Sequence, residues 1–536
     1  MQRRRDTIKK DWRDALLGLA GILFGVTSLA WPFGWDTSVH YYVGREWALR
    51  GALPYRDTFD HKPPFIHVVH AASVTLFGEG MWGIRVIELA CIVVLGWACA
   101  SIAARRGTAV PAGLRGACVL TASVLYYGPF DFYNTAQCEL LGTTLCALAL
   151  LAAWNIRGHA FAVLAAGLLT GAIFALKPPL VLMALVPFAV LATRAVTAAP
   201  SGTGARAAAV ARCAIGFAGS AVVVPSIFVA YFAAHDGASD LLDIVVRCNM
   251  SYLRDEPRLT TAAAIGREMA SVWRVFCPAA PLLFGAAAVA TANAVLRGSR
   301  VGMARWATTW GLFVMSVLVV VVQLKFYFYH WTTPLSAVTL IAANVMVEVA
   351  HAVRASRRGW VPLATALVLL AAFSQSGAQF DGWAASNAAT LHWWRGDWDR
   401  ARFARHFETW DHVRKYAELE AAGLWLRDHS SRDDLVLVRG VATEIYVVSG
   451  LRAPGRFFWT SFLTRPSRRF HREAWLAEDA AVIDARKARW VVTWTGVPEG
   501  PESTSYFAPR GYVERTRVGP YSILERASES GPAARR

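Results

Sequence analysis

The stretch A-L-L-G-L-A-G-I-L-F-G-V-T-S-L-A, residues 15–30, contains no charged side chain. About 20 apolar residues cross a ~30 Å hydrocarbon core as a helix, so this stretch predicts a membrane span at about 15–35. A basic leader precedes it, with Arg3, Arg4, Arg5, Lys9 and Lys10. A signal peptide is the alternative, but Trp31-Pro32-Phe33 makes a poor cleavage site, which favours an uncleaved first span.

Similar apolar runs recur along the chain as far as Phe373. The 536 residues are 55% hydrophobic, which is too high and too blocky for a soluble protein of several domains. The further predicted spans are 82–104, 113–129, 138–155, 160–176, 178–193, 211–234, 276–296, 304–324, 332–351 and 360–378. With the first run they give eleven crossings, in a range of 10–13. The predicted fold class is a polytopic α-helical membrane protein.

The formal charge of +17 has its explanation in the loops between these spans. Basic residues cluster in the N-terminal tail and in the loops at 105–115, 157, 194–212, 297–305 and 354–358. The positive-inside rule places such loops in the cytoplasm, so nucleic acid is not the expected partner. The sequence therefore predicts a multi-pass protein of the bacterial inner membrane, with the C-terminal part in the periplasm.

The composition changes after about Phe380, where hydropathy falls and charge rises. Short apolar runs at 435–438, 490–494 and 521–524 predict strands, and helical segments at 416–429 and 474–487 alternate with them. The predicted organisation is a cytoplasmic tail at 1–14, a transmembrane module at 15–379 with its first periplasmic loop at 36–81, a periplasmic α/β domain at 380–526 and a disordered tail at 527–536.

The first periplasmic loop carries ionisable residues at both of its membrane edges. Asp36 follows the first span directly, and Asp57, Asp60, His61 and Lys62 return to the membrane about twenty-five residues later. Ionisable groups at the edge of a bilayer are costly unless they are paired or face a wet cavity. These residues are therefore candidates for function, and the alternative is a solvated loop with ordinary charges. Pro63-Pro64 would fix the direction of Lys62.

Two further elements are expected in this loop. Residues 38–50 predict a short amphipathic helix that lies along the membrane surface. Residues 65–77 are apolar but too short to cross comfortably, which predicts an interfacial or re-entrant helix.

The strings W-D-T-S-V-H-Y-Y (35–42), G-A-L-P-Y-R-D (51–57) and F-D-H-K-P-P (59–64) resemble the first outer loop of the C-type (GT-C) glycosyltransferases. The nearest branch is the family 39-like group, with protein mannosyltransferases, the aminoarabinose transferase of lipid A and rhizobial lipopolysaccharide core transferases. Segments 134–139, 325–334 and 434–452 resemble later parts of the same family, so the resemblance covers nearly the whole chain. One departure is Thr37, where the family commonly has a second acid.

This resemblance implies a GT-C fold and an inverting transfer of a sugar from a polyprenyl-phosphate donor to a lipid, glycan or protein acceptor. Asp36 matches the family's catalytic aspartate and takes the role of general base. Lys62, with His61, is assigned to the donor phosphate, because lysine suits phosphate as a point charge. Lys177, at an outer membrane edge, is a third candidate for the phosphate, with snorkelling to the interface as the alternative.

The remaining candidates are Asp57, Asp131, Glu139 and His330, which could line the acceptor cavity or hold a divalent metal ion. For Glu139 a helix-opening acid is the alternative, and for His330 a place in an aromatic belt. A divalent metal is the one candidate cofactor, and the loss of an acid at Thr37 weakens any site that needs the pair. A transporter or flippase of lipid-linked glycans is the alternative function, and a non-catalytic assembly protein is a third.

Overall fold

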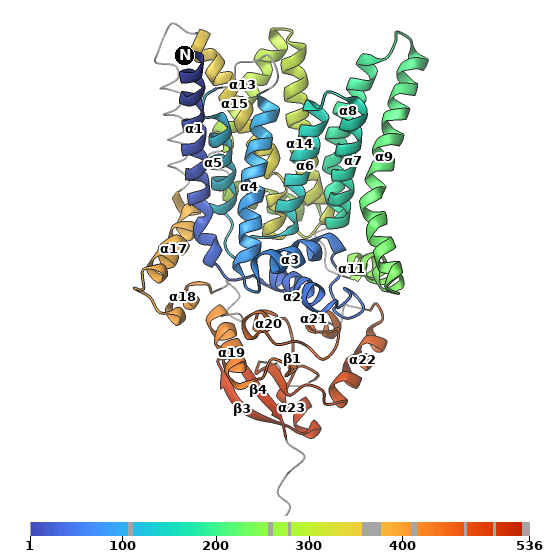
Figure 1. Ribbon diagram of the computed structural model, residues 1–536, viewed down its shortest axis with the longest axis vertical. Helices are drawn as coiled ribbons and strands as arrows, with labels where there is room; N and C mark the ends of the chain where they lie inside the picture. Colours follow the sequence, from blue (N-terminus) through green and yellow to red (C-terminus); the bar gives the residue numbers. More distant parts are fainter. Residues whose placement is uncertain are drawn as a thin grey trace, which may run out of the picture. The chain divides into compact units, whose positions relative to one another are not determined.

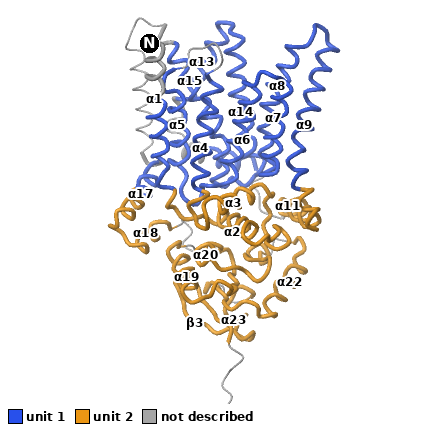
Figure 2. The backbone as a smooth tube through the Cα atoms, in the orientation of Figure 1, with its two compact units in different colours: residues 1–28, 85–228, 258–387 blue, residues 29–84, 229–257, 388–536 orange. Residues whose placement is uncertain are grey.

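A computed structural model of the protein describes residues 2–104, 111–255, 261–276, 280–355, 377–408, 415–465, 469–496 and 500–527. The chain forms two compact units, which Figure 2 shows in different colours. Unit 1 comprises residues 1–28, 85–228 and 258–387, and unit 2 comprises residues 29–84, 229–257 and 388–536. Both units are thus discontinuous in the sequence. The predicted domain boundaries after residues 14, 379 and 526 stay predictions.

Unit 1 is built mainly from long helices whose axes are roughly parallel, while the direction of the chain alternates (Figure 1). Neighbours in the bundle include α1 on α5, α6 on α7 and α13 on α15. The helices that lie wholly or mostly in this unit are α1 (Gln2–Gly25), α4 (Trp82–Ala103), α5 (Leu114–Tyr127), α6 (Cys138–Asn155), α7 (His159–Leu176), α8 (Leu185–Ala198), α9 (Thr203–Ala234), α12 (Ala262–Phe276), α13 (Ala280–Leu296), α14 (Arg300–Gln323), α15 (Leu335–Ala355) and α17 (Gly377–Trp394), with the 3-10 helices η1 (Val26–Ala30), η2 (Pro178–Ala184) and η4 (Phe328–Thr332).

Eight helices of the described residues are long and apolar enough to cross a membrane. They are Trp12–Ala30, Trp82–Ala103, Cys138–Asn155, His159–Leu176, Pro178–Ala198, Thr203–Ala234, Arg300–Gln323 and Phe328–His351. The predicted spans at 113–129 and 276–296 correspond to the shorter apolar helices Leu114–Tyr127 and Leu283–Leu296. The predicted span at 360–378 lies mostly outside the described residues. The fold class is therefore confirmed, and ten of the eleven predicted spans coincide with apolar helices.

Close helix packing in unit 1 depends on glycine. A methyl group added to Gly21 would lie 2.9 Å from the backbone of Leu120, and one added to Gly96 would lie 2.6 Å from the Cα atom of Val119. Both partners belong to α5, so this helix is approached closely from two sides. Small residues allow such approach in membranes, where packing rather than the hydrophobic effect holds helices together.

Unit 2 contains a four-stranded sheet and short helices. The strands β1 (Val436–Val438), β2 (Trp490–Trp494), β3 (Tyr512–Val518) and β4 (Tyr521–Arg526) are ordered β1-β2-β4-β3. The β1–β2 pair is parallel, and the other two pairs are antiparallel. The helical elements are α2 (Trp35–Arg50), α3 (Pro64–Phe77), α10 (Ala238–Leu242), the π-helical segment η3 (Asp243–Cys248), α11 (Asn249–Asp255), α18 (Arg400–His406), α19 (Tyr416–His429), α20 (Glu444–Ser449), α21 (Ser461–Thr464), α22 (Arg472–Asp484), α23 (Thr504–Phe507) and η5 (Ala508–Arg510).

The sheet confirms three predicted strands and adds one. Leu437, Val491 and Leu524, one from each predicted strand, are buried together in its core. Strand β3 was not predicted, because most of its residues are exposed and it alternates charged side chains such as Glu514 and Arg517. A strand at the edge of a sheet needs few apolar residues, so hydropathy gives little signal for it. Residues 528–536 of the predicted tail lie outside the described residues.

The helix α2 corrects one expectation. The helix exists, but residues 37–46 are all buried, so it is no surface helix with one wet face. The covering comes from α3 and from the C-terminal segment of the same unit. Arg45 donates to the carbonyl groups of Tyr446 and Leu451 at 3.0 and 2.7 Å, and the Ala453 N–H donates to the Tyr42 hydroxyl at 2.8 Å. The segment that was predicted as the first periplasmic loop is thus an internal part of unit 2.

Candidate active site

Asp36 lies in the first turn of α2, which begins after Gly34. An acid in this position is favoured by the partial positive charge of the helix N-terminus. Its surroundings are fixed by Ser38, whose hydroxyl donates to the Trp35 carbonyl at 2.7 Å and lies 2.5 Å from the hydroxyl of Thr443. Asp36 itself is half-buried. A half-buried carboxylate on a rigid helix start can accept a proton from a bound hydroxyl group.

Lys62 has a backbone fixed at several points. Its carbonyl accepts a hydrogen bond from the Tyr55 hydroxyl at 2.9 Å, and its N–H donates to Asp60 Oδ1 at 3.3 Å. Pro63, with φ −62°, then opens α3. The side chain is half-buried. α2, which carries Asp36, packs on α3, and Lys62 lies in the turn that leads into α3.

His61 packs between aromatic rings of unit 2. Its ring centroid lies 5.3 Å from that of Tyr252 and 5.6 Å from that of Phe462. Its carbonyl accepts a hydrogen bond from the Asn249 side chain at 2.6 Å. These contacts hold His61 beside Lys62, with 18% of the side chain exposed.

Asp60, a candidate from the sequence, forms a buried cluster with His40 and His67, two histidines that the sequence did not single out. Asp60 Oδ2 lies 3.6 Å from His40 Nε2 and 3.5 Å from His67 Nε2. All three side chains are at most 2% exposed. Two signals could have found it: His40 follows Asp36 by one helical turn, and His67 and His70 are the two ionisable residues of a mostly apolar helix.

Burial controls the ionisation of the two histidines, whereas the neighbouring histidines control that of Asp60. It lowers the pKa of His40 well below its ordinary value, and it also lowers the pKa of His67. Burial alone would raise the pKa of Asp60, but the hydrogen bond from His61 and the attraction of His40 and His67 outweigh it, so the pKa lies below the usual range. Near neutral pH the cluster therefore combines a carboxylate with neutral imidazoles.

A pH dependence of stability follows from these shifts. The unfolded chain takes up protons at His40 and His67 below an ordinary histidine pKa of about 6.5, whereas the folded chain does not. The contribution of the two neutral histidines to the free energy of unfolding is thus fully present above about pH 6.5, and it is lost as the pH falls below that value. Asp60, with its lowered pKa, acts in the same direction at lower pH. We expect the thermal midpoint of the detergent-solubilised protein to fall between pH 7 and pH 5.

The matched comparison is His67→Gln, which removes one titrating imidazole. We expect the variant to be less stable at pH 7 but to lose less on acidification than the native protein. Equal losses in the two proteins would show that His67 does not titrate on unfolding in this range. The pKa of His40 also depends on its charged neighbours. Repulsion from Lys62, His70 and His67 lowers it further, whereas attraction to Asp60 raises it.

Unit 1 brings together three other predicted residues, Glu139, Lys177 and His330. The Lys177 ammonium donates to Glu139 Oε1 and lies 5.6 Å from the ring centroid of Tyr329. His330 Nε2 lies 3.8 Å from the same Glu139 oxygen. All three side chains are buried. Lys177 is therefore paired with an acid, and His330 lies near the same acid while it also packs against the rings of Tyr327 and Tyr329.

Asp57 and Asp131 make mostly local contacts. Asp57 accepts the Leu53 N–H at 2.7 Å, and Asp131 accepts the N–H groups of Tyr133 and Asn134, both at 3.1 Å. Burial raises the pKa of Asp131. Both acids therefore stabilise turns. Within the described ranges, no group of three His, Cys, Asp or Glu side chains could hold a metal ion.

One buried ion pair of unit 1 escaped the sequence reading. Arg85 donates to Glu88 at 2.9 Å, to the Thr135 hydroxyl at 2.6 Å and to the Phe132 carbonyl at 3.2 Å. It joins α4 to the turn before α6, the segment that carries Asp131. The signal available was an arginine and a glutamate three residues apart in an apolar helix.

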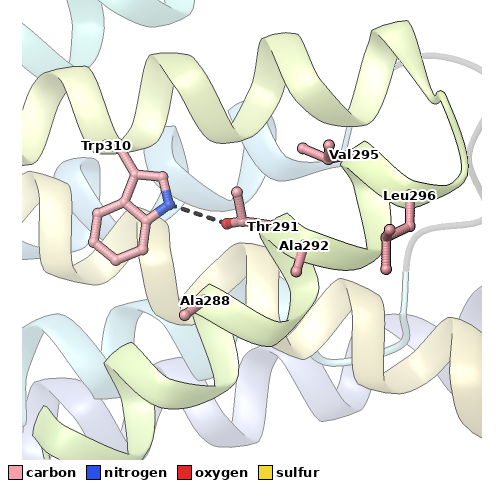
Figure 3. A pocket seen from close by; sticks show the side chains of 6 residues that line it. All are labelled: Ala288, Thr291, Ala292, Val295, Leu296 and Trp310. Carbon is pink, nitrogen blue, oxygen red and sulfur yellow. Dashed lines mark hydrogen bonds between the residues drawn. The ribbon is translucent and has the colours of Figure 1, made fainter.

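A shallow hollow of 490 Å³ lies on unit 1 (Figure 3). The Trp310 indole N–H donates to the Thr291 hydroxyl at 3.0 Å within it. The lining residues are Ala288, Thr291, Ala292, Val295, Leu296 and Trp310. No charged side chain lines the hollow, so it offers no cation to balance the charge of a phosphate.

Comparison with known proteins finds solved structures with a similar fold. No family model matches the chain, and no curated protein matches its sequence. Among solved structures it is similar to ArnT from Cupriavidus metallidurans in the apo state, with a TM-score of 0.56 and 13% identity over 97% of this chain and 99% of that chain. The same protein bound to undecaprenyl phosphate gives a TM-score of 0.56 and 14% identity, over 98% and 99%.

At this identity the likeness shows the fold. The chain is a multi-pass α-helical membrane protein with a small C-terminal sheet domain, and it has the GT-C fold that the sequence resemblance predicts.

Proposed function

We propose that this protein is an inverting membrane glycosyltransferase that transfers a sugar from a polyprenyl-phosphate donor to an acceptor on the periplasmic side of the bacterial inner membrane. The observation that carries the proposal is the likeness to ArnT bound to undecaprenyl phosphate over 98% of this chain and 99% of that one. The placement of Asp36 at the start of α2, and of Lys62 in the turn that leads into the neighbouring helix α3 of the same unit, supports it. The acceptor is a lipid, a glycan such as lipopolysaccharide, or a protein.

The proposed chemistry needs one base and one cation. An acceptor hydroxyl oxygen forms a bond to the anomeric carbon and passes its proton to the Asp36 carboxylate. The bond between that carbon and the phosphate oxygen breaks, and the polyprenyl phosphate leaves with the electron pair. Lys62 stabilises the growing negative charge on the phosphate. Attack from the face opposite the phosphate inverts the configuration.

Lys62 and Lys177 are not equivalent in this scheme. The ammonium of Lys177 is already neutralised by Glu139, so binding a phosphate would require the two to share or exchange partners. Lys62, with its fixed backbone and half-buried side chain, is the better candidate for the phosphate. His61 lies next to it and supports the same role. Lys177, Glu139 and His330 form a buried cluster within unit 1.

The phosphate assignment is tested by binding of undecaprenyl phosphate to the purified protein. Lys62→Gln is expected to weaken binding about 10- to 100-fold, because a hydrogen bond to a charged group contributes about 1.5–3 kcal/mol. The control is Lys415→Gln, which removes an exposed lysine of the same unit that lies 3.9 Å from Glu418. Equal affinity of the Lys62 variant and the native protein would contradict the assignment.

The function as a whole is tested by deletion of the gene and mass analysis of the envelope glycans. We expect one molecule to lose the mass of a single sugar and to regain it when the native protein is restored. If lipid-linked glycans accumulate on the cytoplasmic side instead, a flippase is the better reading. If no envelope glycan changes, the proposal is wrong.

A further inference from the structure

We infer that Asp60 is a positioning residue, which acts through His40 and His67 to hold the start of α2, with Asp36, against the turn that carries Lys62. The inference rests on the proposed function for its catalytic consequence. It rests on distances within unit 2 for its geometry.

The first step is that Asp60 ties down the backbone of Lys62. Its Oδ1 atom accepts the Lys62 N–H at 3.3 Å, and the carboxylate is 2% exposed. Because Pro63 and Pro64 follow and have no N–H, few other backbone bonds are available to this turn. Loss of the carboxylate would remove the bond at the Lys62 N–H and leave the Tyr55 hydroxyl on the Lys62 carbonyl, so the turn that carries the Lys62 side chain would be held less firmly.

The second step is that the other oxygen of Asp60 faces both helices. Asp60 Oδ2 lies 3.6 Å from His40 Nε2, on α2, and 3.5 Å from His67 Nε2, on α3. The His67 ring also interacts with the backbone of Lys62 and of His40, and both interactions favour its protonated form. One buried carboxylate thus connects α2, α3 and the turn between them.

The third step links the cluster to the base. His40 follows Asp36 by four residues, which places both on one side of α2, about one turn apart. The positive charge of Lys62 also lowers the pKa of His40 by repulsion, which places the two residues near each other. A shift of His40 would therefore move the helix start that carries Asp36 relative to Lys62. Misplacement of reacting groups by ~1 Å can cost about 100-fold in rate.

The decisive variant is Asp60→Asn, which keeps the size and one acceptor oxygen but removes the charge that faces the imidazoles. We expect kcat for sugar transfer to fall at least tenfold, with KM for the donor changed less than threefold. The double variant Asp60→Asn/His67→Gln should be no slower than the slower single variant, because the two residues act as one unit. Losses that multiply would overturn the inference.

A matched control is Asp243→Asn, which breaks another aspartate–histidine contact of unit 2. Asp243 lies 3.0 Å from His471, whose side chain is 48% exposed. Transfer by this variant is expected to match the native rate. A comparable loss in the control would mean that any such contact in the unit affects the rate, and it would overturn the specific role of Asp60.

A measurement without transfer separates this inference from the proposed function. Hydrogen exchange at the Lys62 amide is expected to accelerate at least tenfold in Asp60→Ala and to change little in Asp60→Asn. Unchanged exchange in Asp60→Ala would overturn the geometric part even if the protein transfers sugar. If exchange changes as expected but the native protein transfers no sugar, the proposed function fails and the tie between α2 and the Lys62 turn stands.

Discussion

Replacement of Asp36 by asparagine is expected to reduce sugar transfer about 10²- to 10⁴-fold, the usual contribution of a general base. Asparagine has nearly the same shape but accepts no proton, so folding and the binding of undecaprenyl phosphate are expected to match the native protein. The measurement is the transfer rate with a purified polyprenyl-phosphate sugar, beside thermal unfolding of both proteins. A rate within threefold of the native value would remove Asp36 from the reaction.

A control for this variant is Glu418→Gln, in the first turn of α19 in the same unit. Both residues are acids at a helix start, so both substitutions remove a favourable interaction with the helix dipole, worth about 0.3–1 kcal/mol. Only the Asp36 substitution is expected to lower the transfer rate. A similar loss in both variants would point to helix stability instead of proton transfer.

The second large effect is expected on stability. Arg45→Met should lower the free energy of unfolding of unit 2 by about 3–5 kcal/mol, the cost of breaking a buried charge pair by removing one partner. Arg45 is 1% exposed, contacts Glu46 at 2.8 Å and donates to two carbonyl groups more than 400 residues away. Methionine fills most of the volume but satisfies none of these groups. Denaturant unfolding in detergent measures the loss.

Arg50→Met provides the matched control, because Arg50 also pairs with Glu46, at 3.0 Å, from a side chain that is 35% exposed. An exposed pair contributes about 0–1 kcal/mol, so this variant should unfold almost as the native protein does. If the two variants lose equal stability, the long-range bonds of Arg45 contribute little, and unit 2 is held by its apolar contacts.

The histidine cluster shows why a site can escape sequence analysis. His40 and His67 lie in helices whose positions were predicted, yet nothing in the residues between them indicates that both face Asp60. The pairing of Glu139 with Lys177 could not be predicted either, because the two residues are 38 positions apart and a helix lies between them. Hydropathy reports the average environment of a segment, and it carries no information on which polar groups meet inside it.

The sequence by itself determined the helical spans, the apolar strands β1, β2 and β4, and the loop with Asp36 and Lys62. Each of these can be recognised from the composition of a short run of residues. Only the tertiary structure decided that α2 is buried, that the first loop and the C-terminal segment form one unit, and that Asp60 lies between two histidines. These features depend on contacts such as that of Arg45 with Leu451, which arise when distant segments exclude water together.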